Sequence, residues 1–192
     1  GTSVTNGFIF QEYANHFDSF QTGANADADT DNFLSRTKIM PFWFRDIRDN
    51  TTTLFRATIT NFSETITPDW EDGGFVGNPY KFKSYVGTSR SVSVDFKIFA
   101  LTEDELAVNW HKMKYLTKMT YPMFLNSNKL SSSPIIRFSI GNVYSKRYAV
   151  IQNLTYTISE DSRWETVTGA QVPKLIDVSM NLDLSENVGA EN

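Results

Sequence analysis

Histidine and cysteine are the side chains that most often bind metals or move protons near neutral pH, and this chain offers few of them. It has two histidines, His16 and His111, and no cysteine. Neither histidine has another one close in sequence, so we interpret both as solvated or hydrogen-bonded residues. The lack of cysteine excludes disulfides, thiolate catalysis and cysteine-held zinc.

An acidic run near the N-terminus has the start of a calcium-loop pattern. Asp27, Asp29 and Asp31 alternate with small residues. A calcium loop needs glycine at its sixth position and a bidentate glutamate at its twelfth, where this chain has Asn32 and Lys38. We therefore predict a solvated acidic linker with no bound metal.

The other carboxylates are scattered, and no nucleotide-binding, serine-hydrolase or kinase motif occurs. The carboxylates considered are Glu64, Asp69, Glu71, Asp72, Glu160, Asp161 and Glu165. A glycosidase needs two carboxyl groups about 5–10 Å apart, and no spacing here singles out such a pair. Trp70 and Trp164 each lie among acidic residues. They could form a sugar-binding platform, but we favour the interpretation that they are structural anchors. We predict no enzymatic activity and no cofactor.

Length and composition favour one folded domain with an added N-terminal segment. The chain has 192 residues, 14% of them aromatic, which excludes wholesale disorder. The net charge of −4 argues against a general nucleic-acid binder, whose phosphate contacts need clustered Lys and Arg. No apolar run approaches the roughly 20 residues that a membrane span requires.

Alternation of apolar and polar residues predicts strands with one buried face. The clearest cases are 53–62, 91–100 and 176–184, with further strands at 80–86, 135–140 and 147–159. In the last of these we expect Tyr148, Val150, Leu154, Tyr156 and Ile158 to share one face. Loops are predicted at 73–79, 126–134 and 168–169, where Gly, Pro, Asn and Ser gather.

One helix is predicted over residues 102–118. Thr102 and Glu105 have the spacing of a capping box, and Tyr121-Pro122 marks the end. Leu106, Trp110 and Met113 then follow at helical spacing and predict a core-facing stripe, continued by Leu116 or Thr117. The predicted core anchors of the whole chain are Trp43, Phe55, Val94, Phe96, Leu106, Trp110 and Met113. Strands before and after one helix predict a mainly β sandwich or barrel.

The chain divides into an N-terminal arm and flexible linker at 1–37, a β domain at 38–186 and a C-terminal tail at 187–192. The arm carries Phe8, Phe10, Tyr13, Phe17 and Phe20. Exposed phenylalanines are costly, so we expect the arm to dock on another surface, such as a neighbouring copy.

Several segments of the β domain follow one another in a familiar order. They are IMPFWFRD at 39–46, FRA at 55–57, ITPDW at 66–70, YKFKSYV at 80–86, RSVSVDFKIFA at 90–100, LTEDEL at 101–106, LT at 116–117, YP at 121–122, IGNVY at 140–144, WET at 164–166 and VPK at 172–174. In order and spacing they resemble the tube-fold domain of the tail-tube junction and tube-initiator proteins in the baseplates of contractile-tailed phages. The resemblance covers about residues 38–185.

That resemblance implies a tail-tube-like fold of two packed antiparallel sheets with one helix, and six copies in a ring. Four strands of each subunit would line a continuous inner barrel. The implied partners are other copies of the chain, the baseplate hub, the tail tube protein or a second tube-initiator ring, and the tape-measure protein. DNA would only pass through the lumen, and no membrane is involved. The implied location is the virion tail, with assembly in the host cytoplasm.

Two surfaces follow as expectations. Candidates for the lumen wall are Ser91, Ser93, Asp95, Asp177, Ser179, Asn181 and Asp183. Candidates for subunit-interface loops are Gly73, Gly74, Gly77, Asn78, Pro79, Asn126, Ser127 and Asn128. Two alternatives stay open: the main tail tube subunit of a contractile injection system, and a carbohydrate-binding or hydrolytic β domain that uses Trp70 or Trp164.

Overall fold

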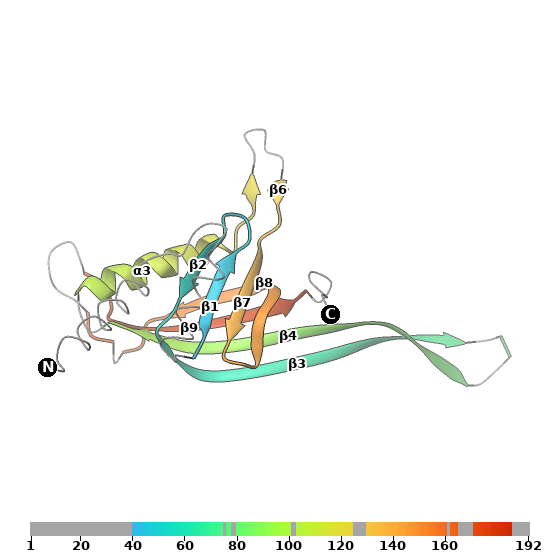
Figure 1. The fold of residues 1–192 in the computed structure, drawn as a ribbon. Helices are drawn as coiled ribbons and strands as arrows, with labels where there is room; N and C mark the ends of the chain where they lie inside the picture. Colours follow the sequence, from blue (N-terminus) through green and yellow to red (C-terminus); the bar gives the residue numbers. More distant parts are fainter. Residues whose placement is uncertain are drawn as a thin grey trace, which may run out of the picture.

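The computed structural model describes residues 40–74, 76–77, 80–100, 103–124, 130–160, 162–164 and 171–185. This part of the chain is mainly β with one helix, as predicted (Figure 1). The elements are β1 (Phe42–Asp46), β2 (Thr51–Leu54), β3 (Ala57–Gly74), β4 (Lys81–Phe99), α3 (Glu103–Lys118), β5 (Met123–Phe124), β6 (Leu130–Ser132), β7 (Ile135–Ile140), β8 (Tyr144–Thr157) and β9 (Leu175–Leu184).

Seven strands form one continuous antiparallel sheet in the order β2-β1-β7-β8-β9-β4-β3, and β5 pairs with β6 separately. β1 and β4 are four places apart, which in a flat sheet means about 19 Å. Yet the ring centroids of Phe42 on β1 and Phe96 on β4 are 4.9 Å apart. The sheet therefore curls until its ends face each other, so the two packed layers that we expected are the two ends of one sheet.

An aromatic and aliphatic core fills the concave side of this sheet. Phe96 touches three rings, those of Phe42, Phe44 and Phe55. α3 closes the same side, because Met113 and Leu116 of the helix and Met119 just after it are buried in the same cluster. The anchors Trp43, Phe55, Val94, Phe96, Leu106 and Met113 are all buried, whereas Trp110 is only partly buried.

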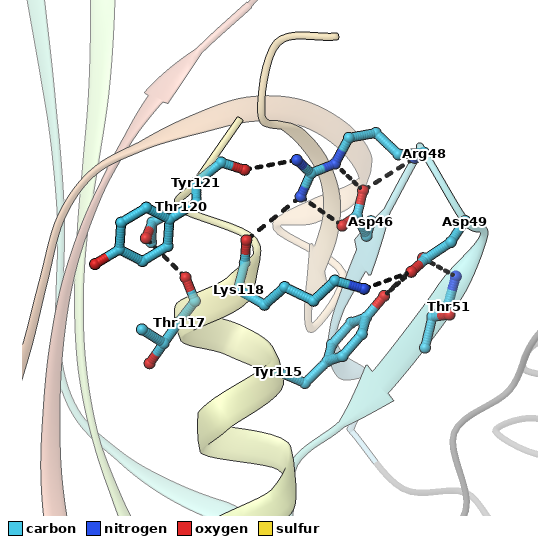
Figure 2. A network of polar contacts seen from close by, with 9 residues as sticks. All are labelled: Asp46, Arg48, Asp49, Thr51, Tyr115, Thr117, Lys118, Thr120 and Tyr121. Atoms are coloured by element: carbon cyan, nitrogen blue, oxygen red, sulfur yellow. Dashed lines mark hydrogen bonds and ion pairs between the residues drawn. The ribbon is translucent and has the colours of Figure 1, made fainter. Parts of the chain in front are cut away.

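A polar network ties the end of α3 to the turn between β1 and β2 (Figure 2). Arg48 binds Asp46 through two nitrogens, at 2.8 and 2.7 Å, and both side chains are buried. The same guanidinium donates to the carbonyl of Tyr121 at 2.6 Å, beyond the last helical turn. Nearby, the Tyr115 hydroxyl and the Lys118 ammonium donate to Asp49 at 2.6 and 3.2 Å.

Several boundaries differ from the sequence predictions, and β-bulges explain one error. An extra residue between Ile151 and Asn153 shifts the register of β8 against β9. A bulge exchanges the two faces of a strand. Consequently Ala149 and Ile151 enter the core before the bulge and Leu154 after it, so the single face predicted for 147–159 is wrong. The predicted strands 80–86 and 91–100 are one 19-residue strand, β4.

Some predictions concern residues that the structure does not describe. They include the N-terminal arm with His16, the acidic run at 27–31, Thr102 of the capping box and the C-terminal tail. Within the described ranges, no helix is long and apolar enough to cross a membrane.

Candidate assembly surfaces

The convex side of four adjacent strands carries an almost unbroken set of polar side chains, which we call the polar face. The register places Ser91 opposite Asp183, Ser93 opposite Asn181 and Asp95 opposite Ser179. The full set is Thr58, Asn61, Ser63 and Thr65 on β3; Ser91, Ser93, Asp95 and Lys97 on β4; Asp177, Ser179, Asn181 and Asp183 on β9; and Asn153, Thr155 and Thr157 on β8. The two short polar runs predicted from the sequence are thus neighbours on one surface.

The charge of the polar face is low and slightly acidic. Three aspartates accompany a single lysine, Lys97, whose ammonium lies 3.5 Å from the Asp177 carboxylate. The Asn61 amide donates to Asp95 at 3.1 Å, which ties β3 to β4 across the face. Because phosphate affinity comes from Lys and Arg, this surface offers DNA little to bind.

The β4 and β9 parts of the polar face were predicted from the sequence, whereas those on β3 and β8 were not. The reason is again local: bulges next to Thr60 on β3 and Gln152 on β8 break the alternation midway. Past the first bulge, Phe62 lies on the core side opposite Val94, and Ser63 lies on the polar side opposite Ser93. The sequence feature that could have indicated these parts is the high content of Thr, Ser and Asn in β3 and β8.

β3 and β4 continue beyond the sheet as a two-stranded ribbon, which we call the projecting hairpin. The last β4 residue paired with β9 is Ser91, so residues 66–74 and 81–90 pair only with each other. Nine extended residues span about 30 Å. Figure 1 shows this ribbon twisting far out from the body of the molecule.

The projecting hairpin exposes large apolar side chains along its length. Ile66, Trp70, Phe82, Tyr85 and Val86 are each about half exposed, and Tyr80 near the tip is 80% exposed. Trp70 and Tyr85 form a cross-strand pair in edge-to-face geometry, with centroids 5.4 Å apart. A two-stranded ribbon has no second layer on which to bury such residues, so this surface has the properties of a contact site.

Other features of the projecting hairpin fix its strand register and protect its edge. The Lys83 ammonium lies 3.3 Å from Asp72, and Arg90 Nε donates to Glu64 at 2.9 Å. Hydrogen bonding from Arg90 lowers the pKa of Glu64. β3 is an edge strand of the sheet, and Pro68 in it has no backbone N–H to donate. A proline on an edge strand hinders pairing with a strand of another molecule.

The predicted loop residues only partly lie in loops. Gly73 and Gly74 end β3 and pair with Phe82 and Lys81. The Phe82 ring lies across Gly73, so a Cβ at this position would require the half-exposed ring to move. Gly77, at φ 85°, lies in the turn of the hairpin. Asn78, Pro79, Asn126, Ser127 and Asn128 lie outside the described residues.

The positions of Trp70 and Trp164 argue against a sugar-binding platform that both tryptophans share. Trp70 pairs with Tyr85 on the projecting hairpin, whereas Trp164 is bridged to Pro173, near the other end of β4. About fifteen extended residues, roughly 50 Å, separate these two places along β4. The two tryptophans therefore belong to separate surfaces. Among the described side chains, no cluster of three His, Asp or Glu is placed to hold a metal ion.

Comparison with known proteins identifies no family. No protein-family model and no curated protein matches the chain. Among solved structures, a chain from the tail of an empty gene transfer agent particle with C6 symmetry aligns with 76% of this chain and 90% of its own length. The sequence identity is 9% and the TM-score 0.35, too low to assign a fold or a function.

Proposed function

We propose that this chain is a structural subunit of a phage tail, forming a six-fold ring at the junction of baseplate and tail tube and initiating the tube. The family resemblance suggests this role. The observation that supports it best is the polar face, four neighbouring strands wide and nearly free of unpaired cations. A channel wall that DNA must pass without sticking needs this combination.

The projecting hairpin supplies what such a ring needs at its contacts. Its half-exposed aromatic residues become buried if a neighbouring subunit or the next ring lies against them. A ring of identical subunits uses head-to-tail contacts, and a rotation of about 60° closes six of them. The chain then acts through shape and surface, without catalysis and without a cofactor.

Electron microscopy of the purified full chain, alone and mixed with a baseplate hub, tests the proposal. We expect rings with a central hole that form on the hub and there seed tube growth. Rings that stack into long tubes without any hub would favour the main tail tube subunit. A chain that stays monomeric even on the hub would contradict the ring.

Binding to a glycan array tests the alternative that the chain is a carbohydrate-binding domain. We expect no binding, because Trp70 packs edge-on against Tyr85 and lies far from Trp164. Specific binding that is lost in a Trp70→Ala variant would support that alternative over a structural role.

A further inference from the structure

The projecting hairpin leaves the body of the molecule at a defined boundary on β4. Ser91 is the last β4 residue that pairs with β9, opposite Asp183, and β9 ends at Leu184. From Arg90 outward, β4 pairs with β3 alone. A two-stranded ribbon is strongly twisted and only marginally stable by itself. Its backbone pairing therefore fixes its direction relative to the body only weakly, and side chains at this boundary can decide it.

Glu64 and Arg90 form an ion pair across the boundary. Glu64 lies opposite Val92, in the part of β4 that also pairs with β9, whereas Arg90 lies opposite Ile66 on the free ribbon. Arg90 Nε donates to Glu64 Oε1 at 2.9 Å, and Arg90 Nη2 donates to the same oxygen. Arg90 and Val92 share one side of β4, so the pair lies at the rim of the core side of the sheet.

Tyr144, the first residue of β8, reaches the same rim from another part of the sheet. Its ring centroid is 5.7 Å from that of Phe138 on β7 and 5.8 Å from that of Phe62 on β3. Glu64 is the next side chain after Phe62 on this side of β3, so Tyr144 lies beside the ion pair. Burial and then the Glu64 carboxylate raise the pKa of the Tyr144 hydroxyl, in agreement with this position.

Tyr144 is itself held firmly to the body. The Ser139 hydroxyl of β7 donates to the Tyr144 carbonyl at 3.0 Å, and the Tyr144 ring belongs to the aromatic core. β8 and β3 are three places apart in the sheet, so the curl of the sheet brings Tyr144 to the root of the hairpin. The contact with Phe62 thus joins the root to a part of the body that β4 and β9 do not reach.

We propose that Glu64, Arg90 and Tyr144 form a latch that fixes the direction in which the projecting hairpin leaves the body. The ion pair joins the two strands at the boundary, and Tyr144 holds this joint against the core. With the latch intact, the hairpin and the body move together. Without it, the ribbon bends at the boundary.

The latch is a conformational property of the single chain and does not depend on the proposed ring. A hairpin held in one direction presents Trp70 and Tyr85 in one orientation before any partner arrives, and such preorganisation lowers the cost of forming a contact. The side chains of Arg90 and Glu64 are 30% and 28% exposed. Ion pairs open to solvent contribute little to stability, so variants that lack this pair should still fold.

Distances between two spin labels test the latch, because the chain has no cysteine of its own. The labels are attached to Ser84→Cys, exposed on the hairpin, and Lys114→Cys, exposed on α3. Pulsed electron paramagnetic resonance is recorded on the full chain, diluted with unlabelled chain so that only intramolecular distances contribute. We expect one narrow distance distribution for the native latch and at least a twofold greater width for Arg90→Met and for Glu64→Gln.

Two further variants separate the latch from a general effect of lost charge. The exchanged pair, Glu64→Arg with Arg90→Glu, should restore the narrow distribution. Lys97→Met is the matched control, since it removes an ion pair between β4 and β9 inside the body, where Lys97 lies 3.5 Å from Asp177. Its distribution should be as narrow as that of the native latch.

Three results would overturn the proposal. A broad distribution with the native latch would show that the hairpin has no fixed direction. Equal widths for the native latch, Arg90→Met and Glu64→Gln would show that other contacts fix it. An exchanged pair that stays broad would show that the ion pair is not the cause. Tyr144→Leu removes the ring beside Glu64 and should also broaden the distribution, and an unchanged width would exclude Tyr144 from the latch.

Discussion

At the scale of single residues, the most constrained interaction is the pair of Arg48 and Asp46 at the end of α3. Their side chains are 6% and 1% exposed, and the guanidinium also binds helix-end carbonyls (Figure 2). The hydrogen bond to Asp46 raises the pKa of Arg48, which favours the charged guanidinium. It holds the β1–β2 turn against the helix.

Replacing Arg48 by methionine should therefore cost about 3–5 kcal/mol of unfolding free energy, because the Asp46 carboxylate is left buried without its partner. Urea denaturation monitored by circular dichroism measures the loss. The double variant Arg48→Met/Asp46→Asn removes the orphaned charge and should recover part of it. Equal losses in the single and double variants would contradict this explanation.

Asp49, in the same network, makes stability depend on pH. Burial works to raise the pKa of its carboxyl, but hydrogen bonds from Tyr115, Thr51 and Lys118 outweigh that effect and lower it from 3.8. The folded state thus has the lower pKa, and the stabilisation is present above pH 3.8 and is lost as the pH falls further.

We expect an Asp49→Asn variant to be less stable than the native chain at pH 7 and to lose less stability on acidification. Thermal melts from pH 7 to about pH 2 measure both curves and cover the range below pH 3.8 in which the native carboxyl protonates. Asp72→Asn, which removes an exposed ion-paired carboxylate on the hairpin, is the control. Parallel curves for the native chain and Asp49→Asn would show that this carboxyl does not contribute.

At the scale of elements, the projecting hairpin has aromatic residues that add nothing to the core. A Trp70→Ala/Tyr85→Ala variant should therefore keep its melting temperature within a few degrees while ring or tube assembly falls at least tenfold. Tyr121→Ala is the matched control, since Tyr121 is 64% exposed on the body of the protein. Light scattering and electron microscopy measure assembly. Normal assembly by the double variant would show that the hairpin is not part of the contact surface.

Most elements were predictable from the sequence, because a strand or helix with one buried face has apolar residues at regular intervals. β7 and β9 match their predicted ranges closely, and α3 matches the helical stripe. The long hairpin was not predictable in the same way, since both of its faces are exposed and its residues show no burial pattern. The curling of the sheet depends on contacts such as Phe42 with Phe96, far apart in the chain, which no local pattern encodes.

At the scale of the whole molecule, the proposed channel requires that the polar face have few cations, and Lys97 is the one cation among its described residues. Ser93→Lys with Asn181→Lys places two added cations opposite each other on neighbouring strands, β4 and β9. Assembled rings of this variant should bind short double-stranded DNA much more tightly than native rings, and added salt should weaken that binding. Fluorescence anisotropy measures it. The same substitutions at Thr88 and Ser84 of the hairpin control for charge alone.

We propose that the polar face lines the channel of a six-fold ring. A cryo-electron microscopy reconstruction of the ring assembled on a baseplate hub would show which face of the sheet meets the channel. We predict six subunits whose β8, β9, β4 and β3 strands form the inner wall, with Ser93, Ser179 and Asn181 facing the hole. A ring whose polar face points outward, or a chain that forms no ring on the hub, would show that this face does not line a channel.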